Sequence, residues 1–334
     1  MRAGDLPIGV VTIGRNEGER LQRCLRSLHG KVTRIVYVDS GSSDGSADFA
    51  RSLGVEVVEL DMSKPFSMAR GRNAGFQRLL ELDPDLPLVQ FVDGDCEVAE
   101  GWLKTAAAYL EAHPACTVVC GRRQERFPRA SVYNLLCDIE WNTPVGVAKA
   151  CGGDALMRVP PLREAEGFNE SLIAYEEPDL CLRLRLAGGE IHRIDALMTL
   201  HDANIHHFRA WWRRTLRSGY GAMDLRHKWA GKIAADQLPG HHLLQSAPRW
   251  SVMWLAATCA LALLWRPLLL LGFLAWTVQA LKIAKDVRSR APNPAAALAY
   301  GGFTMIGKWA QLLGMLQHRR DRRNGKLITL IEYK

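Results

Sequence analysis

The stretch VQFVDGDCEV, residues 89–98, places two carboxylates directly after a run of apolar residues. Phe91 and Val92 are typical of a buried strand, whereas Asp93 and Asp95 repel each other unless a positive charge lies nearby. Two carboxylates on a short loop suit a hard divalent cation, Mg²⁺ or Mn²⁺, which takes its remaining ligands from water and a diphosphate. We therefore predict a metal-dependent site at the end of this strand.

The elements that must position these carboxylates alternate between strand and helix. Apolar, β-branched runs predict strands at residues 8–13, 55–60 and 86–92 and another in RIVYVD, and helical spacing predicts helices between them. This alternation predicts βαβ units and a mostly parallel sheet, on which ligands bind at the carboxyl ends of the strands. The loops VDSGSSDG and VDGD both follow strands, so we expect them to face one crevice.

Composition indicates a globular protein with two differently charged halves. The chain has 334 residues, 48% hydrophobic, and its eight cysteines form no CxxC pair, which indicates neither a zinc site nor a disulfide framework. The N-terminus shows no apolar segment typical of a secretory signal. Residues 1–200 carry 23 Lys and Arg against 29 Asp and Glu, whereas residues 201–334 carry 20 against 6. The basic half predicts an anionic partner, either nucleic acid or a membrane surface.

Two apolar runs in the basic half favour the membrane. Residues 251–265 and 268–281 are uncharged, are separated by Arg266-Pro267, and have basic flanks on both sides. Each run is shorter than the ~20 residues of a full span. Flanks of one charge predict that both stay on the cytoplasmic face of the inner or plasma membrane, with a helical hairpin or a re-entrant pair between them. A buried hairpin in a soluble domain is the alternative, and tryptophans near the run ends favour the membrane over it.

Two further segments extend this interpretation. HHFRAWWRRTLRSGYG, residues 206–221, mixes aromatic and arginine side chains that suit either stacked nucleic-acid bases or a lipid surface. Met305, Trp309 and Leu316 share one face of a predicted helix that ends in HRRDRR, as in helices that lie among lipid headgroups. Together with the apolar runs, these segments predict membrane lipids as a partner and no nucleic acid.

Five motifs in order resemble the family 2 glycosyltransferases, which have the GT-A fold. The resemblance covers about residues 7–225 and rests on VVTIGRNEGERL, VYVDSGSSDGS, ARGRNAGF, VDGD, and the pair CGGDALMR and GFNESLIAYEEPDLCLRLRL. It implies an α/β fold with a mostly parallel mixed sheet flanked by helices. The expected organisation is a catalytic domain over 1–225, a linker over 226–249, and an apolar helical hairpin with a basic amphipathic helix over 250–334.

The resemblance also implies roles for individual residues. Asp39 would contact the nucleobase, Asp95 would bind the metal with His201, and Asp93 would hold the ribose or the metal's waters. The residues implied beside the nucleotide-sugar donor are Thr12, Arg15, Asn16, Glu17, Arg70 and Asn73, and those implied beside the acceptor are Gly152, Gly153 and Asp154. Taken singly, several of these have ordinary structural explanations, such as helix capping by Asp39.

The acidic pair Glu176-Glu177 is predicted to supply the general base. Where the family usually shows Glu-Asp-x-Asp-Leu, this chain has EEPDL, so Glu177 stands at the position of the base and Glu176 could compete for the role. We expect Pro178 to begin a helix and to hold Glu177 extended just before it. One base opposite a leaving diphosphate implies single displacement with inversion, because retention through a covalent intermediate uses a second carboxylate near the anomeric carbon.

These inferences predict a transferase that moves a sugar from a nucleoside-diphosphate sugar to an acceptor hydroxyl, with a lipid-linked or envelope polysaccharide as the natural acceptor. Two alternatives remain open. A nucleotidyltransferase also uses paired aspartates and a metal, although the chain shows no glycine-rich triphosphate loop near its start. A non-catalytic membrane-bound scaffold of the same fold would be expected to have lost its acidic motifs, which are present here.

Overall fold

The computed structural model describes residues 6–326, which form two compact units. Unit 1 comprises Met1–Arg126 and Trp141–Ala203, and unit 2 comprises Phe127–Glu140 and Asn204–Lys334. The observed division therefore lies earlier than the expected boundary at residue 225. The expected linker over 226–249 contains a helix, α9 (His241–Pro248).

Unit 1 is built on one mixed sheet of nine strands. Parallel pairs join β3, β2, β1 and β4, and antiparallel pairing begins at β8. In sheet order the strands are β3 (Glu56–Glu59), β2 (Val32–Asp39), β1 (Leu6–Gly14), β4 (Leu88–Asp93), β8 (Ala155–Arg158), β6 (Cys116–Glu125), β9 (Glu190–His201) and β5 (Cys96–Val98), and β7 (Gly146–Val147) pairs with β9 outside this order. This is the mixed α/β architecture that the alternation of patterns predicts.

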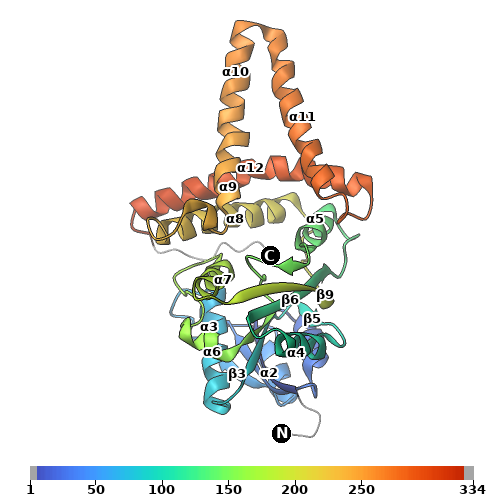
Figure 1. Ribbon diagram of the computed structural model, residues 1–334, viewed down its shortest axis with the longest axis vertical. Coiled ribbons are helices and arrows are strands. Elements are labelled where there is room, and N and C mark those ends of the chain that lie inside the picture. The colour runs from blue at the N-terminus through green and yellow to red at the C-terminus, as the bar shows by residue number, and fades with distance from the viewer. Residues whose placement is uncertain (1–5, 327–334) are drawn as a thin grey trace. The chain divides into compact units, whose positions relative to one another are not determined.

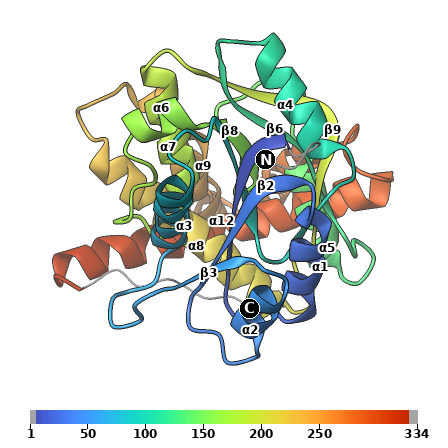
Figure 2. The same ribbon diagram turned by 90° about the horizontal axis from the view of Figure 1, so that it is seen from below.

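Helices cover both faces of this sheet. In Figure 2, α3 and α7 lie on one side of the sheet and α1 and α4 on the other. Their bounds are α1 (Glu19–Leu28), α2 (Ser46–Ser52), α3 (Met68–Leu82), α4 (Trp102–Ala112), α6 (Val159–Glu164) and α7 (Glu176–Leu186). The close approach of α3 depends on Gly75, where a Cβ would lie 2.5 Å from Val11 Cγ1 and 2.8 Å from Val38 Cγ2.

Unit 2 is helical, and its two long helices pack through glycines. α8 (Phe208–Lys228) runs parallel to α12 (Pro294–Arg323). A Cβ on Gly219 would lie 2.0 Å from Gln311 O, and one on Gly314 would lie 2.1 Å from Leu216 O. These contacts leave no room for larger side chains, so the two backbones meet directly, much as small residues allow in other close helix pairs.

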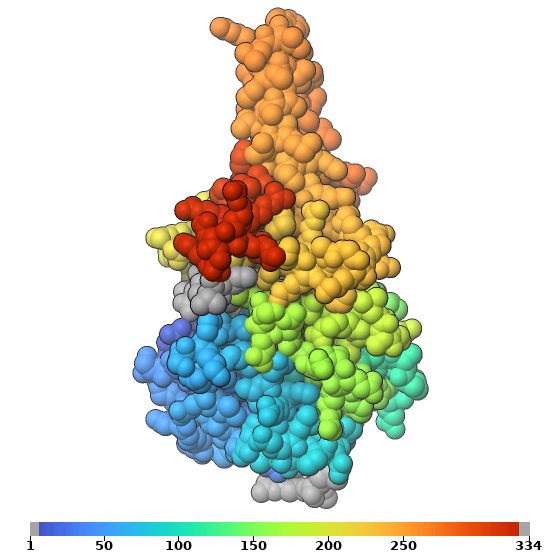
Figure 3. Space-filling view, turned by 90° about the vertical axis from the view of Figure 1, so that its left-hand side faces the viewer, coloured from blue at the N-terminus to red at the C-terminus, as the bar shows by residue number. Residues whose placement is uncertain are grey.

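A hairpin of apolar helices projects from these two helices (Figure 1). Its first arm runs from α9 through a π-helical segment, Arg249–Met253, into α10 (Trp254–Leu264), and its second arm is α11 (Leu269–Asp286). The chain turns at Trp265–Pro267, as the sequence predicts from Arg266-Pro267. Figure 3 shows the hairpin surface standing clear of the rest of unit 2.

The hairpin exposes its apolar side chains instead of burying them. Leu263 is 89% exposed, Leu270 70% and Phe273 63%. Both arms, His241–Leu264 and Arg266–Asp286, are long and apolar enough to cross a membrane, with mean hydropathies of 1.3 and 1.6. Within the 18-residue window tested in each arm, only 17% and 11% is buried, whereas the core helix of a soluble domain is mostly buried. The hairpin therefore presents a large apolar surface, of a kind that soluble monomers rarely show.

Candidate active site

The carboxyl ends of three neighbouring strands bring the acidic loops together. In the sheet register, Gly14 at the end of β1 pairs with Asp39 at the end of β2, and Ile13 pairs with Asp93 at the end of β4. The two acidic loops thus lie at one edge of the sheet, on either side of β1. This is the placement that a nucleotide-binding crevice requires in an α/β sheet.

Asp93 lies in a line of alternating buried charges. The Arg72 guanidinium on α3 donates to Asp93 Oδ1 at 2.8 Å and to Glu176 Oε1 at 2.7 Å. On the other side of Asp93, Arg123 on β6 lies 3.7 Å from its Oδ2 and 3.0 Å from Asp154 Oδ2. Burial alone would raise the pKa of Asp93, but the charges of Arg72 and Arg123 outweigh it and hold that pKa below its ordinary value.

Asp95 faces a different set of side chains. His201 Nε2, at the end of β9, lies 3.2 Å from Asp95 Oδ2, and the His201 ring stacks on Trp141 with centroids 4.5 Å apart. The Cys96 thiol donates to Asp95 Oδ1 at 3.7 Å, and burial raises the pKa of that thiol. The structure thus brings together the two residues predicted to share a metal, Asp95 and His201.

These residues fit a divalent cation. Their ligand atoms lie within 4.8 Å of one another and both side chains are buried. A carboxylate oxygen suits Mg²⁺ or Mn²⁺, and a neutral imidazole nitrogen is a common metal ligand in proteins. His201 Nδ1 is buried and makes no hydrogen bond within residues 6–326. The sequence did not indicate Trp141, whose ring lies between His201 and Arg123, with the Arg123 guanidinium 5.7 Å from its centroid.

The predicted donor loop is tightly hydrogen-bonded. The buried Asp39 carboxylate accepts from the Tyr37 hydroxyl at 2.8 Å and from the backbone N–H groups of Gly41 and Ser42. Asn16, which has a left-handed φ of 54°, accepts from the N–H of Ser43 and donates its own N–H to the Ser42 hydroxyl. These bonds tie the loops after β1 and β2 to each other.

The remaining predicted donor residues occupy different surroundings. Thr12 is fully buried in β1, Arg15 is exposed, and Glu17 forms an ion pair with Arg20 at 2.8 Å. The two residues predicted from ARGRNAGF, Arg70 and Asn73, bind backbone groups away from Asp93. Arg70 donates to the carbonyls of Lys64, Pro65 and Asp61. Asn73 exchanges hydrogen bonds with the backbone of Phe168.

Arg72 is not among the residues predicted beside the donor, yet it is the side chain that reaches Asp93, whereas Arg70 and Asn73 do not. It is 2% exposed, and its guanidinium also lies 5.5 Å from the centroid of the Phe168 ring. A helix turns by 100° per residue, so alternate residues on α3 cannot share a face. From the sequence, only this periodicity could have indicated that Arg70 and Arg72 of ARGRNAGF lie on different faces of the helix.

The predicted acceptor loop lies directly against Asp93. A Cβ on Gly153 would lie 2.7 Å from Asp93 Oδ2 and 2.9 Å from a terminal nitrogen of Arg72, so a larger residue there would have to displace these side chains. Gly152 adopts φ +84°, a conformation that favours glycine. Asp154 is fully buried, where it accepts from the Asp93 N–H and from the Thr199 hydroxyl. The loop is thus fixed to the same network as the metal-site loop.

The acidic pair is helical, which corrects one prediction. α7 begins at Glu176, so Pro178 is its third residue and Glu177 is not extended. Proline is tolerated anywhere in the first turn because the N–H groups there lack intrahelical acceptors.

Glu176 and Glu177 nevertheless face different groups. Glu176 binds Arg72, whereas Glu177 Oε1 accepts from the Cys151 N–H at 2.6 Å and from the thiols of Cys151 and Cys181, each at 3.1 Å. Burial raises the pKa of Glu177, and the three hydrogen bonds from the cysteines act against that rise. The two carboxylates therefore lie in different surroundings, because only Glu176 touches a permanent cation.

With this geometry in place, comparison with known proteins identifies the domain. Residues 10–144 match the family described as Glycosyl transferase family 2. The chain carries a family 2 glycosyltransferase domain. Within it lie all the predicted donor residues and both aspartates of VDGD, while His201 and the acidic pair lie beyond residue 144.

Two curated relatives of this chain are named as glycosyltransferases. A pre-mycofactocin glycosyltransferase from Mycobacterium tuberculosis is 27% identical over 251 residues, which are 71% of this chain and 51% of that protein. The chain thus spans about half the length of that relative. Glycosyltransferase AglE from Haloferax volcanii is 23% identical over 111 residues, 31% of this chain and 35% of that protein.

Solved structures share the fold. A mannosyltransferase from Pyrobaculum calidifontis in complex with GDP-Man and Mn²⁺ superposes with a TM-score of 0.60 and 18% identity, covering 91% of this chain and 88% of that one. Staphylococcus aureus TarS 1–349 superposes with a TM-score of 0.53 and 14% identity, covering 96% and 92%. These likenesses confirm the predicted GT-A fold with its helical C-terminal region.

Proposed function

We propose that this protein transfers a sugar from a nucleoside-diphosphate sugar to an acceptor hydroxyl, by metal-dependent single displacement with inversion. The observation that carries the proposal is the meeting of Asp93, Asp95 and His201 at the strand ends of a family 2 domain. The structural neighbour from Pyrobaculum, solved in complex with GDP-Man and Mn²⁺, supports a nucleotide-sugar donor and a divalent cation. The acceptor we propose is a lipid-linked or envelope saccharide.

Asp95 and His201 are the residues that would hold Mg²⁺ or Mn²⁺. When bound, such a cation stabilises the negative charge that develops on a leaving diphosphate. Asp93 has a separate task, since Arg72 and Arg123 already balance its charge. Its ionised carboxylate can accept hydrogen bonds from a ribose or from metal-bound water. The donor loop, fixed by Asp39 and Asn16, would fit the nucleoside.

Glu177 is the residue we assign as the general base. A base is most effective when its pKa lies near the working pH, and burial moves the pKa of Glu177 upward, in that direction. Glu176 is less suited to the role because its carboxylate is already engaged in an ion pair with the Arg72 guanidinium 2.7 Å away. We infer that Glu176 acts through Arg72, by holding that side chain against Asp93.

Membrane association is the second part of the proposal. The apolar hairpin is exposed along both arms, and basic residues flank it on both sides, which supports insertion with both flanks on the cytoplasmic face. Such an anchor would keep the site beside a lipid-linked acceptor. The lipid and its headgroup would then be partners of unit 2, and the donor a partner of unit 1.

Two experiments test the assignment. A panel of UDP-, GDP- and dTDP-sugars with Mn²⁺ should reveal donor hydrolysis or transfer for at least one donor; pyrophosphate release from a nucleoside triphosphate instead would indicate a nucleotidyltransferase. With the active donor, Glu177→Gln should reduce turnover by about 10²–10⁴-fold with little change in donor affinity. Glu176→Gln should reduce it much less. The reverse order would mean that the two glutamates have exchanged roles.

A further inference from the structure

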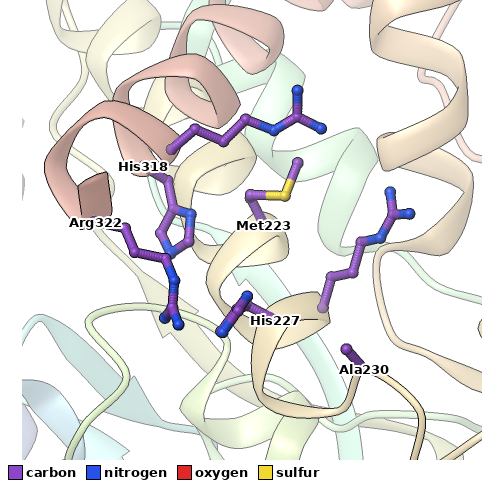
Figure 4. A pocket seen from close by; sticks show the side chains of 7 residues that line it. Met223, His227, Ala230, His318 and Arg322 are labelled. Carbon is purple, nitrogen blue, oxygen red and sulfur yellow. The ribbon is translucent and has the colours of Figure 1, made fainter.

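Unit 2 contains a cavity where the C-terminal ends of α8 and α12 meet. The cavity has a volume of about 250 Å³, several times the ~30 Å³ share of one water molecule. Figure 4 shows Met223 and His227 of α8 beside His318 and Arg322 of α12 around it. Arg226 and Arg319 also line it, so that its wall combines three arginines with two histidines. None of these residues belongs to the site in unit 1.

The charges of this wall are not neutralised by neighbours. Within residues 6–326, the side chains of Arg226, Arg319 and Arg322 make no hydrogen bond or ion pair. Basic residues at helix C-termini are common because they face the negative end of the helix dipole. The wall nevertheless stays positive, because its three guanidinium groups have no carboxylate partner among the residues that the structure describes.

A buried imidazole is the second sign of a ligand. His318 is 2% exposed, and neither of its ring nitrogens makes a hydrogen bond within the described residues. Its Nε2 lies 3.4 Å from Asp224 Oδ1, and its ring meets Tyr220 edge-on. Burying a polar group without a hydrogen bond is costly, and such groups are usually satisfied by a ligand or by water.

We propose that this cavity binds a phosphate group, as a phosphate monoester or a diphosphate. Arginine forms paired hydrogen bonds with phosphate oxygens, and three of them around one cavity with two imidazoles suit a doubly charged anion. The phosphate has two possible sources, a soluble phosphate compound or the headgroup of a lipid. The lipid source is favoured because the two helices that form the cavity also carry the apolar hairpin, whose first segment, α9, packs against both α8 and α12.

The test measures binding to the full chain in neutral detergent micelles, with EDTA present to suppress metal-dependent binding in unit 1. The probes are inorganic pyrophosphate, followed by calorimetry, and mixed micelles that contain phosphatidic acid. The test variant is Arg319→Gln/Arg322→Gln. Its matched control is Arg320→Gln/Arg323→Gln, which removes the same charge from the same exposed helix end but from residues that do not line the cavity.

We expect the test variant to weaken binding at least about tenfold, and the control to change it less than about twofold. This pattern with pyrophosphate supports the site and a soluble ligand, and the same pattern with phosphatidic acid alone supports the site and a lipid ligand. Equal losses in the two variants would show unspecific charge attraction and overturn the proposal, as would saturable binding to neither probe. No sugar donor is present, so the result does not depend on the proposed transfer activity.

Discussion

Arg72 offers the sharpest test of the buried charge network. Its guanidinium is 2% exposed and lies 2.7–2.8 Å from Glu176 and Asp93. Arg72→Met keeps most of the side-chain volume but leaves two buried carboxylates without this cation. Removing one partner of a buried ion pair costs about 3–5 kcal/mol. For a unit of about 190 residues, where 1 kcal/mol corresponds to about 2–4 °C, the melting temperature should fall by roughly 6–20 °C.

The assay is thermal unfolding of the full chain in detergent, followed by far-ultraviolet circular dichroism. Arg70→Met is the matched control on the same helix, because Arg70 is less buried and binds only backbone carbonyls. It should shift the melting temperature by no more than about 2 °C. Adding Glu176→Gln to Arg72→Met should restore part of the loss, since one unpaired charge disappears. If Arg72→Met and Arg70→Met melt alike, the network does not stabilise the fold as argued.

Three other perturbations address the metal, the base and the hairpin. Asp95→Asn should abolish nearly all transfer while leaving the fold intact by circular dichroism, and full wild-type activity in excess chelator would contradict a metal role. The rate of transfer should rise with pH as Glu177 loses its proton. Cys181→Ala should move this rise to higher pH, because it removes a thiol hydrogen bond that lowers the pKa of Glu177. Cys116→Ala, which changes a buried cysteine away from Glu177, should leave the pH profile unchanged. Leu263→Asp with Leu270→Asp should release the chain from membranes without lowering its melting temperature, since both side chains are exposed in the protein but each would cost about 2.5–3.5 kcal/mol in a bilayer. Leu186→Asp changes an exposed leucine of unit 1 and is the control. If the Leu263→Asp/Leu270→Asp variant sediments with membranes in high salt as the control does, insertion through the hairpin is contradicted.

The sequence predicted the fold best for the strands, whose positions follow from local patterns of apolar residues. The apolar runs at 8–13, 55–60 and 86–92 match β1, β3 and β4 to within two residues at each end, because buried parallel strands need continuous β-branched stretches. The division between the two units, after Ala203, does not coincide with the boundary predicted near residue 225. α8 begins at Phe208 and packs along α12 through Gly219 and Gly314, and no local pattern shows that two helices some 95 positions apart will meet.

The site could be predicted only in part, because the sequence shows which side chains could do chemistry more easily than it shows where each side chain points. Asp93, Asp95 and Gly153 come together as the motifs predict, but Arg70 turns to backbone carbonyls while Arg72 enters the network. Trp141, 46 residues beyond Asp95, reaches His201 only through tertiary packing. Predicting this contact requires the relative placement of Trp141 and the last residue of β9, which no local sequence pattern gives.

The negative charges of the two aspartates of VDGD are balanced by different groups, and this difference supports their separate proposed roles. Asp93 lies between two guanidinium groups, so the protein itself supplies its counter-charge and fixes its oxygens in place. Asp95 lies beside an imidazole, a group that serves as a metal ligand only when it is neutral. A cation added between Asp93 and its arginines would meet two fixed positive charges, whereas one added at Asp95 would meet a carboxylate and a nitrogen lone pair. If the protein binds a divalent cation, as we propose, electrostatics would therefore favour the second aspartate, which lies beside His201 of β9.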